Sequence, residues 1–568
     1  MKKISLFIGL SVATFSLVSA QTAFKDVPKG WHLLDLQKDG YYGIDVEKTY
    51  AELLKGRKSV PVVVAIIDSG VDTTHEDLKP VLWHNPKEIP GNGIDDDNNG
   101  YIDDVYGWNF LGGKDGRNVN KDSYEAARVY YKLKKKYGNS IPADSIATPD
   151  QKEEIRLYRI VKDRIEGDAK EASMNVMFLK NIVDKMPWSD SVLQASLKKS
   201  EYSWDDLQQF KPVTDDDRVA WITIKSLFQG FQANDLSSKK LIEITNEFYN
   251  GEKSKKDAVS QEPEDYRGEI VKDNYDDIND RYYGNGDVMA GTPMHGTHVA
   301  GIIGAVRNNG IGMNGVAGNV KIMMIRAVPD GDEHDKDIAN AIRYATDNGA
   351  RVVNMSFGKS LSPEKKWVDD AVKYAESKGV LLVHAAGNDG KDVDVNDNFP
   401  NANYNNDTAT KASNWITVGA SGDPAAGGLT ASFSNYGKHQ VDVFAPGVKI
   451  YSTLPGGNQY GNLQGTSMAS PVVAGMAALI MSYFPDLNAK QVKSIIEKST
   501  THITNMTVKK PGTDEEVKMS ELSTSGGIIN AYAAVKLAES LSKQPQKTAA
   551  KKPASVLPKA QMKKAKKG

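Results

Sequence analysis

The sequence predicts an α/β protein with a doubly wound, mostly parallel sheet flanked by helices, and with a mainly helical insertion. Short, wholly apolar runs alternate with segments of helical periodicity, which is the order of a sheet whose strands are joined by helices. The runs lack the alternation of half-exposed strands, so both faces of the sheet should be covered. One polar segment, 113–262, interrupts the pattern.

The apolar runs define the expected elements. The strands are expected at 62–67, 321–325, 352–355, 380–384 and 415–418, and the helices at 297–305, 335–348, 364–377 and 467–483. Ligand sites in such sheets form beyond the carboxyl ends of the strands. Asp68 directly follows the first run, so it is expected at the edge where a site would form.

Residues 58–112 and 263–540 are expected to form one domain, interrupted by a helical insertion at 113–262. The insertion repeats apolar side chains on one helical face, as in Ala126, Tyr130, Leu133 and Tyr137. A solvated, partly disordered loop is the alternative, but a disordered spacer has no need of apolar stripes.

The N-terminus has the pattern of an export signal. Lys2 and Lys3 precede an apolar run at 4–18, and small residues ending at Ala20 form a cleavage site. We therefore expect residues 1–20 to be removed and the mature chain, without a transmembrane segment, to be periplasmic or secreted. A membrane anchor is the alternative, although the run is shorter than a bilayer span.

Composition narrows the remaining possibilities. The net charge of −2 does not indicate nucleic-acid binding, and the absence of cysteine excludes a thiol nucleophile and disulfides. Residues 21–57 are expected to be an N-terminal extension. The tail, 541–568, is basic, has no acidic residue and is expected to be flexible, with contact to anionic surfaces as the alternative.

Three short motifs supply a carboxylate, an imidazole and a hydroxyl in that order. They are DSG at Asp68, HGTH at His295 and GTSMA around Ser467. Such a trio activates a serine: the imidazole takes the hydroxyl proton, and the carboxylate orients the ring. For each residue alone a structural role is the alternative, and His298 and Asp72 are competing candidates. His295 is preferred because the start of its helix faces an open site, and Asp72 suits a turn.

Asn388 is the expected donor to the oxyanion of the reaction. It follows a buried strand in a glycine-rich turn, AAGNDG, and its amide together with the backbone N–H of Ser467 would bind the developing negative charge. A turn-forming asparagine is the alternative.

These motifs together resemble those of the subtilases, the subtilisin-like serine proteases. The resemblance covers roughly 58–112 and 265–535 and depends on VAIIDSGVD, HGTHVAGIIG, VVNMSFG, AAGNDG and GTSMASPVVAG. It implies a subtilisin-like fold, a triad of Asp68, His295 and Ser467, and Asn388 as oxyanion donor. It also implies that substrate pairs in extended form with Ser356, Phe357 and Gly358.

The chain departs from the subtilase pattern in two places. The insertion separates the Asp68 and His295 motifs, which is tolerated if its ends meet, but which can restrict access to the cleft. The N-terminal extension is also too short for the usual folding propeptide, so autoprocessing is not assumed.

An acidic loop at 93–106 resembles a calcium-binding loop of the EF-hand type. Asp95, Asp97 and Asn99 take its first, third and fifth positions and Asp103 its ninth. The bidentate glutamate is missing, and Asp104 is a possible substitute; a solvated acidic turn is the alternative. The subtilase resemblance implies a second calcium site at Asp77 and Asn309. Calcium would be structural, since the chemistry needs no metal.

The sequence therefore predicts an exported serine endopeptidase that cleaves protein or peptide substrates in extended conformation through an acyl-enzyme on Ser467. A peptide-binding subtilase-like scaffold is one alternative, although it would not need an intact triad. An acyl or peptidyl transferase is another, because it would share the acyl-enzyme.

Overall fold

The structure is a computed structural model. It describes residues 27–542 apart from 139–147, 232, 234, 235, 292, 405, 406, 502 and 504. The expected export signal, and all but the first two residues of the basic tail, lie outside the described residues.

A seven-stranded sheet forms the centre of the molecule, in the order β2-β3-β1-β4-β5-β8-β9, and all its neighbouring strands are parallel. The strands are β1 Val62–Asp68, β2 Gly107–Asn109, β3 Val320–Arg326, β4 Val352–Met355, β5 Leu381–Ala385, β8 Trp415–Ser421 and β9 Val443–Pro446. All five expected strands lie in this sheet, so the predicted α/β class is confirmed.

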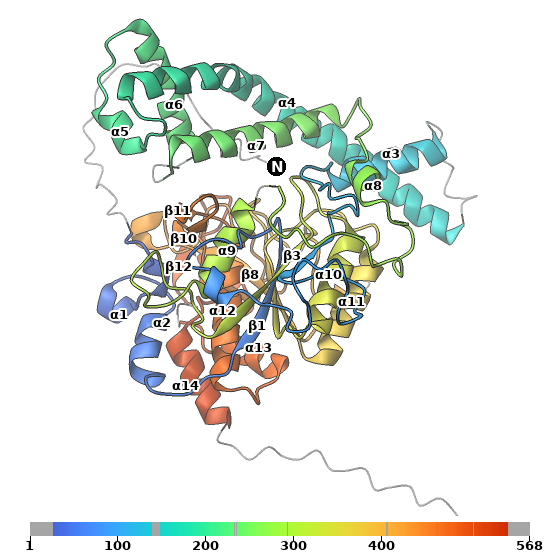
Figure 1. Cartoon of the computed structure of the whole chain (residues 1–568), viewed down its shortest axis with the longest axis vertical. Helices are drawn as coiled ribbons and strands as arrows, with labels where there is room; N and C mark the ends of the chain where they lie inside the picture. Colours follow the sequence, from blue (N-terminus) through green and yellow to red (C-terminus); the bar gives the residue numbers. More distant parts are fainter. Residues whose placement is uncertain are drawn as a thin grey trace, which may run out of the picture.

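Helices cover both faces of the sheet (Figure 1). Along β1, Val64 and Ile66 enter one apolar cluster, whereas Ala65 and Ile67 enter another. The first cluster includes residues of α9 Met294–Gly304, α12 Thr466–Tyr483, α13 Ala489–Lys498 and α14 Ala531–Ser542; the second includes residues of α10 Asp335–Asp347 and α11 Lys365–Lys378. This division explains why the strands are apolar at every position.

Helix α12 lies at the centre of the first cluster. In the described part of the chain it is the helix with the length and hydropathy to cross a membrane, contrary to our expectation that no segment after the signal would have them. However, 89% of its apolar window is buried inside the protein. Its composition is therefore that of a core helix.

The segment before the sheet packs onto the domain. It contains η1 Trp31–Leu33, α1 Leu36–Asp39, α2 Val46–Lys48 and η2 Thr49–Leu53. Trp31 is fully buried in the first apolar cluster with Ile44, and its indole N–H donates to the carbonyl of Val448 at 3.1 Å. This part of the N-terminal extension thus contributes to the core.

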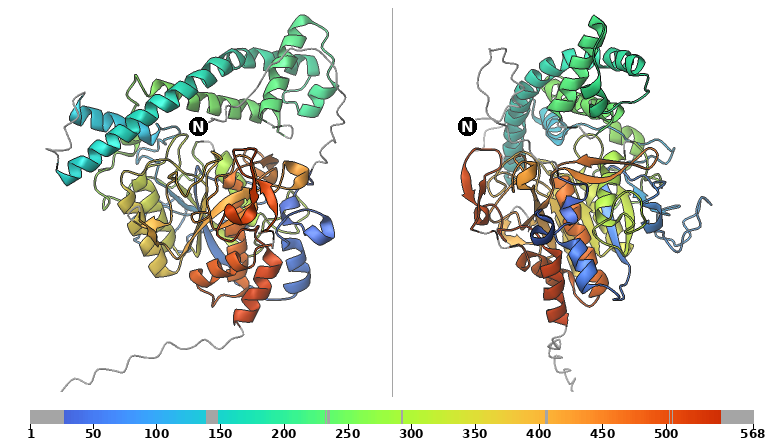
Figure 2. Two further views of the ribbon diagram at one scale, coloured as in Figure 1. Left: turned by 180° about the vertical axis from the view of Figure 1, so that it is seen from behind. Right: turned by 90° about the vertical axis from the view of Figure 1, so that its left-hand side faces the viewer.

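Residues 113–262, which we call the helical arm, contain five helices in their described part: α3 Glu125–Tyr137, α4 Pro149–Leu197, α5 Trp204–Gln209, α6 Asp215–Gly230 and α7 Ser238–Asp257. The arm lies along one end of the sheet domain (Figures 1 and 2). It has apolar clusters of its own: Ala126 and Leu133 of the expected stripe pack against α4, and α4, α6 and α7 share a second cluster. Helix α8 Tyr266–Val271 leads back to the domain.

Short elements complete the structure. They are the hairpins β10 Ile450–Leu454 with β11 Gln459–Leu463, β6 Asn403–Tyr404 with β7 Asp407–Lys411, and β12 Thr507–Lys509 with β13 Glu516–Lys518, and the turns η3 Lys79–Val81, η4 Pro424–Ala426 and η5 Met519–Glu521. The β10–β11 hairpin lies beside α9, where the hydroxyl of Ser452 donates to the carbonyl of His298 at 2.7 Å.

Replacing Trp31 with alanine should lower the free energy of unfolding by about 3–5 kcal/mol, because a buried tryptophan leaves a cavity when truncated. Guanidinium unfolding followed by near-UV circular dichroism measures the change. Trp188→Ala is the matched control, since Trp188 is 42% exposed on α4. Equal losses in the two variants would contradict the burial of the N-terminal segment.

Candidate active site

Asp68 is the last residue of β1, at the carboxyl edge of the sheet. Its side chain is buried, and Oδ1 accepts a hydrogen bond from the backbone N–H of Ser69 at 2.8 Å. The apolar run holds the strand in the core, and the carboxylate emerges where the run ends.

His295 lies in the first turn of α9 and meets Asp68. Its Nδ1 lies 2.8 Å from Oδ1 of Asp68. Gly296 makes this approach possible, because a Cβ at that position would lie 2.1 Å from the carbonyl oxygen of Gly70. A neutral ring that donates through Nδ1 keeps the lone pair of Nε2 available as a base.

The charges around His295 favour its protonated form. Burial opposes protonation, but the charge and hydrogen bond of Asp68, together with the charge of Glu247, raise the pKa of His295 above its usual value. The ring is 36% exposed, so it stays accessible from the cleft.

The competing candidates have structural partners instead. His298 is fully buried, its Nε2 lies 3.1 Å from the carbonyl oxygen of Gly461, and burial lowers its pKa to about 3. Asp72 accepts hydrogen bonds from the backbone and hydroxyl of Thr74 and from the backbone of Gly456. Neither residue forms the carboxylate–imidazole pair.

Ser467 lies in the first turn of α12, directly beside the edge that follows β4. Its hydroxyl donates to the carbonyl of Ser356 at 3.1 Å, and the hydroxyl of Ser356 donates to the carbonyl of Ser467 at 2.9 Å. Among the described residues, Ser467 therefore has Ser356 and not His295 as its hydrogen-bond partner. Catalytic hydrogen bonds often form only when substrate is bound.

Asn388 follows β5 and reaches the same helix start. Its Oδ1 accepts hydrogen bonds from the backbone N–H and the hydroxyl of Thr466, at 2.8 and 2.9 Å. Because the oxygen is held there, the amide nitrogen of this exposed side chain remains available as a donor next to Ser467. The four chain-distant residues Asp68, His295, Asn388 and Ser467 thus lie at one edge of the sheet.

The segment Ser356, Phe357 and Gly358 directly follows β4 and lies beside Ser467. The carbonyl of Phe357 is bound by the ring of His384, at 2.8 Å from Nε2. The ring of His384 therefore helps to hold this segment beside Ser467, where the substrate-binding edge is expected.

Comparison with known proteins agrees with this geometry. The sequence matches the subtilase family over residues 60–520. The chain belongs to the subtilase family.

Individual relatives cover smaller parts of this subtilase. The thermophilic serine proteinase of Bacillus sp. (strain AK1) is 37% identical over 295 residues, which are 50% of this chain and 65% of that protein. Thermitase of Thermoactinomyces vulgaris is 36% identical over 240 residues, 41% of this chain and 78% of thermitase. A solved protease from Pseudoalteromonas arctica, 34% identical, covers 43% of this chain and 70% of its own, with a TM-score of 0.35.

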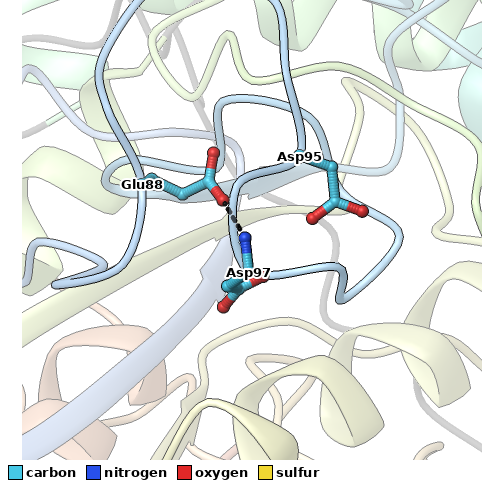
Figure 3. A group of neighbouring side chains, drawn as sticks. All are labelled: Glu88, Asp95 and Asp97. Atoms are coloured by element: carbon cyan, nitrogen blue, oxygen red, sulfur yellow. Dashed lines mark hydrogen bonds between the residues drawn. The ribbon is translucent and has the colours of Figure 1, made fainter.

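The acidic loop of this subtilase brings three carboxylates together: Glu88, Asp95 and Asp97 (Figure 3). Each offers an oxygen, and these oxygens lie within 4.8 Å of one another. Glu88 is 8% exposed, and its Oε2 has no hydrogen-bond partner in the described structure. Carboxylate oxygens in this number suit Ca²⁺, and the buried Glu88 oxygen without a hydrogen-bond partner could serve as one of its ligands.

The other expected ligands differ in their placement. Asn99 lies beside the trio, and its backbone N–H donates to Asp95 and Asp97. Asp103 instead caps the backbone of Gly93, and Asp104 accepts hydrogen bonds from the hydroxyl of Tyr344 at 2.6 Å and from the side-chain amides of Asn85 and Asn99. Glu88 was missed by the sequence analysis, because it precedes the loop and has no place in the EF-hand spacing.

At the expected second calcium site, the carboxylate of Asp77 accepts hydrogen bonds from the protein. Asp77 is fully buried and accepts from the side-chain amide of Asn309, the hydroxyl of Tyr460 at 3.0 Å and the backbone N–H of Met313 at 3.3 Å. These donors satisfy the carboxylate without a cation, and the second site stays a prediction.

The substitution Asp68→Asn should lower the pKa of His295, because it removes the charge and the acceptor that favour the imidazolium. NMR titration of the ring protons measures this directly and does not depend on activity. His298 is the internal control: with a pKa of about 3 it should stay neutral in both proteins throughout the titration of His295. An unchanged titration of His295 in the variant would show that Asp68 does not act on it.

Proposed function

We propose that this subtilase is an exported serine endopeptidase that hydrolyses peptide bonds through an acyl-enzyme on Ser467. The observation that supports it best is the 2.8 Å contact between Asp68 and His295 beside the serine. A peptide-binding scaffold would not need a buried carboxylate to orient an accessible imidazole, so the enzyme is favoured over the scaffold.

In the proposed reaction, Ser467 turns from the carbonyl of Ser356 to Nε2 of His295 and gives up its proton as it attacks the substrate carbonyl. The backbone N–H of Ser467, one of the unpaired donors at a helix start, and the amide of Asn388 bind the oxyanion. His295 then protonates the leaving amine, and water, activated by the same ring, releases the acyl group. Loss of one oxyanion donor lowers kcat by about 10²–10³-fold.

The proposed substrates are proteins or peptides that bind as an extended strand along Ser356–Gly358. Main-chain pairing on such an edge does not depend on side chains, which suits an enzyme that cleaves many sequences. Export to the periplasm or the medium is proposed from the N-terminal pattern of charge, apolar run and small residues.

We also propose a structural calcium ion held by Glu88, Asp95 and Asp97. The cation would neutralise three carboxylates that otherwise repel one another, and so stabilise the loop before β2. It has no part in the proposed chemistry.

A fluorophosphonate probe should label Ser467, because only an activated serine reacts with it. Peptide mapping of the labelled protein identifies the residue. Ser467→Ala should abolish labelling and lower kcat/KM for a peptide by about 10⁶-fold, while Ser470→Ala, a serine one turn further along α12, should remain labelled at Ser467. Labelling at another residue would refute the mechanism.

The gain in melting temperature on adding calcium should be smaller in Glu88→Gln than in the unmodified protein, because one charged ligand is lost. The comparison uses differential scanning calorimetry with calcium and with a chelator. Asp103→Asn is the control, since Asp103 caps the backbone of Gly93 and is not one of the trio. If only the Asp103 variant lost the calcium response, the trio would be the wrong ligand set.

A further inference from the structure

The helical arm is fastened to the domain next to the substrate-binding edge. Leu361, three residues after Gly358, is buried in the apolar cluster that α3 and α4 form, with Val161 and Ile165. The guanidinium of Arg164 on α4 donates to the carbonyl of Ser360 at 2.9 Å. This end of the arm is therefore attached to the residues that follow the Ser356–Gly358 edge.

Buried ion pairs reinforce this attachment. The ammonium of Lys359 lies 2.7 Å from Glu125 of α3 and 2.9 Å from Asp335, and the lysine is 1% exposed. Arg128 on α3 pairs with Glu125 at 2.8 Å and donates to the carbonyl of Asp332. Breaking a buried pair leaves an uncompensated charge, so this end of the arm is held firmly.

The other end of the arm rests on the opposite side of the site. Leu236, just before α7, belongs to the apolar cluster of α4, α6 and α7. Leu236 packs closely against Gly461 of β11. If Gly461 carried a Cβ, that atom would lie 3.2 Å from a methyl carbon of Leu236. The carbonyl of Gly461 in turn is bound by His298 on α9, one turn from His295.

Between the two attachments, α4 and α7 cross the end of the domain at which α9 begins (Figures 1 and 2). Glu247 lies in the middle of α7, and its charge is among those that raise the pKa of His295. Burial, Glu243 and Asp330 raise the pKa of Glu247 to about 7, against the opposing effects of Lys240 and His295. Glu247 is thus near enough to His295 and to Asp330 for their charges to interact.

We propose that the helical arm is a roof across the substrate cleft and that it restricts this protease to unstructured polypeptide segments, which pass beneath α7. The proposal rests on the proposed peptidase function and names its substrate class. An extended strand needs a layer of about 10 Å, whereas a small folded domain is about 30 Å across. We therefore expect a chain to pass between the Ser356–Gly358 edge and α7, and the arm to stop a folded body that contains the same sequence.

The test compares one cleavable octapeptide sequence in two settings: as a free quenched peptide and within a surface loop of a globular protein. The unmodified enzyme should cleave the loop about 100-fold more slowly than the peptide, because the arm stops the folded body that carries the loop until the loop unfolds locally. Leu361→Asp removes the apolar attachment of the arm. In this variant the ratio of peptide cleavage rate to loop cleavage rate should fall about tenfold, because the loop is cleaved faster. Equal rates on both substrates in the unmodified enzyme, or an unchanged ratio in the variant, would overturn the proposal.

A second measurement does not depend on releasing the arm. Glu247→Gln should move the acid limb of kcat/KM for the free peptide to lower pH, because Glu247, with a pKa of about 7, carries part of its negative charge where His295 titrates, and loss of that charge lowers the pKa of His295. Asp257→Asn is the matched control at the end of the same helix: Asp257 is not among the charges that act on His295 or on Glu247. Identical pH profiles for both variants and the unmodified enzyme would show that α7 does not lie above the site.

Failure of the roof can be told apart from failure of the enzyme. If the fluorophosphonate labels Ser467 but the loop and the peptide are cleaved alike, the roof alone is wrong. If Ser467 is not labelled and the peptide is not cleaved, the proposed peptidase function fails and the roof fails with it.

Discussion

The site of this subtilase depends on the contact between Asp68 and His295. The two residues come from β1 and α9, which the helical arm separates in sequence, and their side chains meet only because α9 packs directly against the end of β1. Gly296 permits that packing, since any side chain there would collide with the carbonyl of Gly70. The position of one glycine thus determines whether the carboxylate can orient the imidazole.

The arm can be accommodated because it leaves and rejoins the domain near the same edge. The entropy of closing a loop grows slowly with its length, so a long insertion costs little once its ends are placed. The arm also has apolar clusters of its own and is tied to the domain through Lys359 and Leu361. The same ties hold the arm across one end of the domain, so in the proposed roof the access of substrate depends on the stability of the arm.

The acidic loop shows how far metal ligands can be predicted from their spacing in the sequence. Asp95 and Asp97 meet as the EF-hand spacing predicts, but the third carboxylate is Glu88, whose place depends on the path of the chain before the loop. Asp103, which fits the spacing, turns to the backbone of Gly93, and Asp104, the expected substitute for the missing glutamate, accepts a hydrogen bond from Tyr344. The spacing of residues within a loop identifies ligands that the loop itself supplies. It does not identify ligands, such as Glu88, from a segment that folds back onto the loop.

The amino-acid sequence by itself determined the α/β class, the places of five strands along the chain and the identity of the candidate catalytic residues. These follow from local features, namely wholly apolar runs and the residues at their ends, which keep their meaning in any subtilase. Only the tertiary structure decided that Ser467 contacts Ser356, that Glu88 joins the acidic trio and that the charge of Glu247 on α7 acts on His295. Those contacts join residues far apart in the chain, and their geometry depends on packing between elements that no local pattern records.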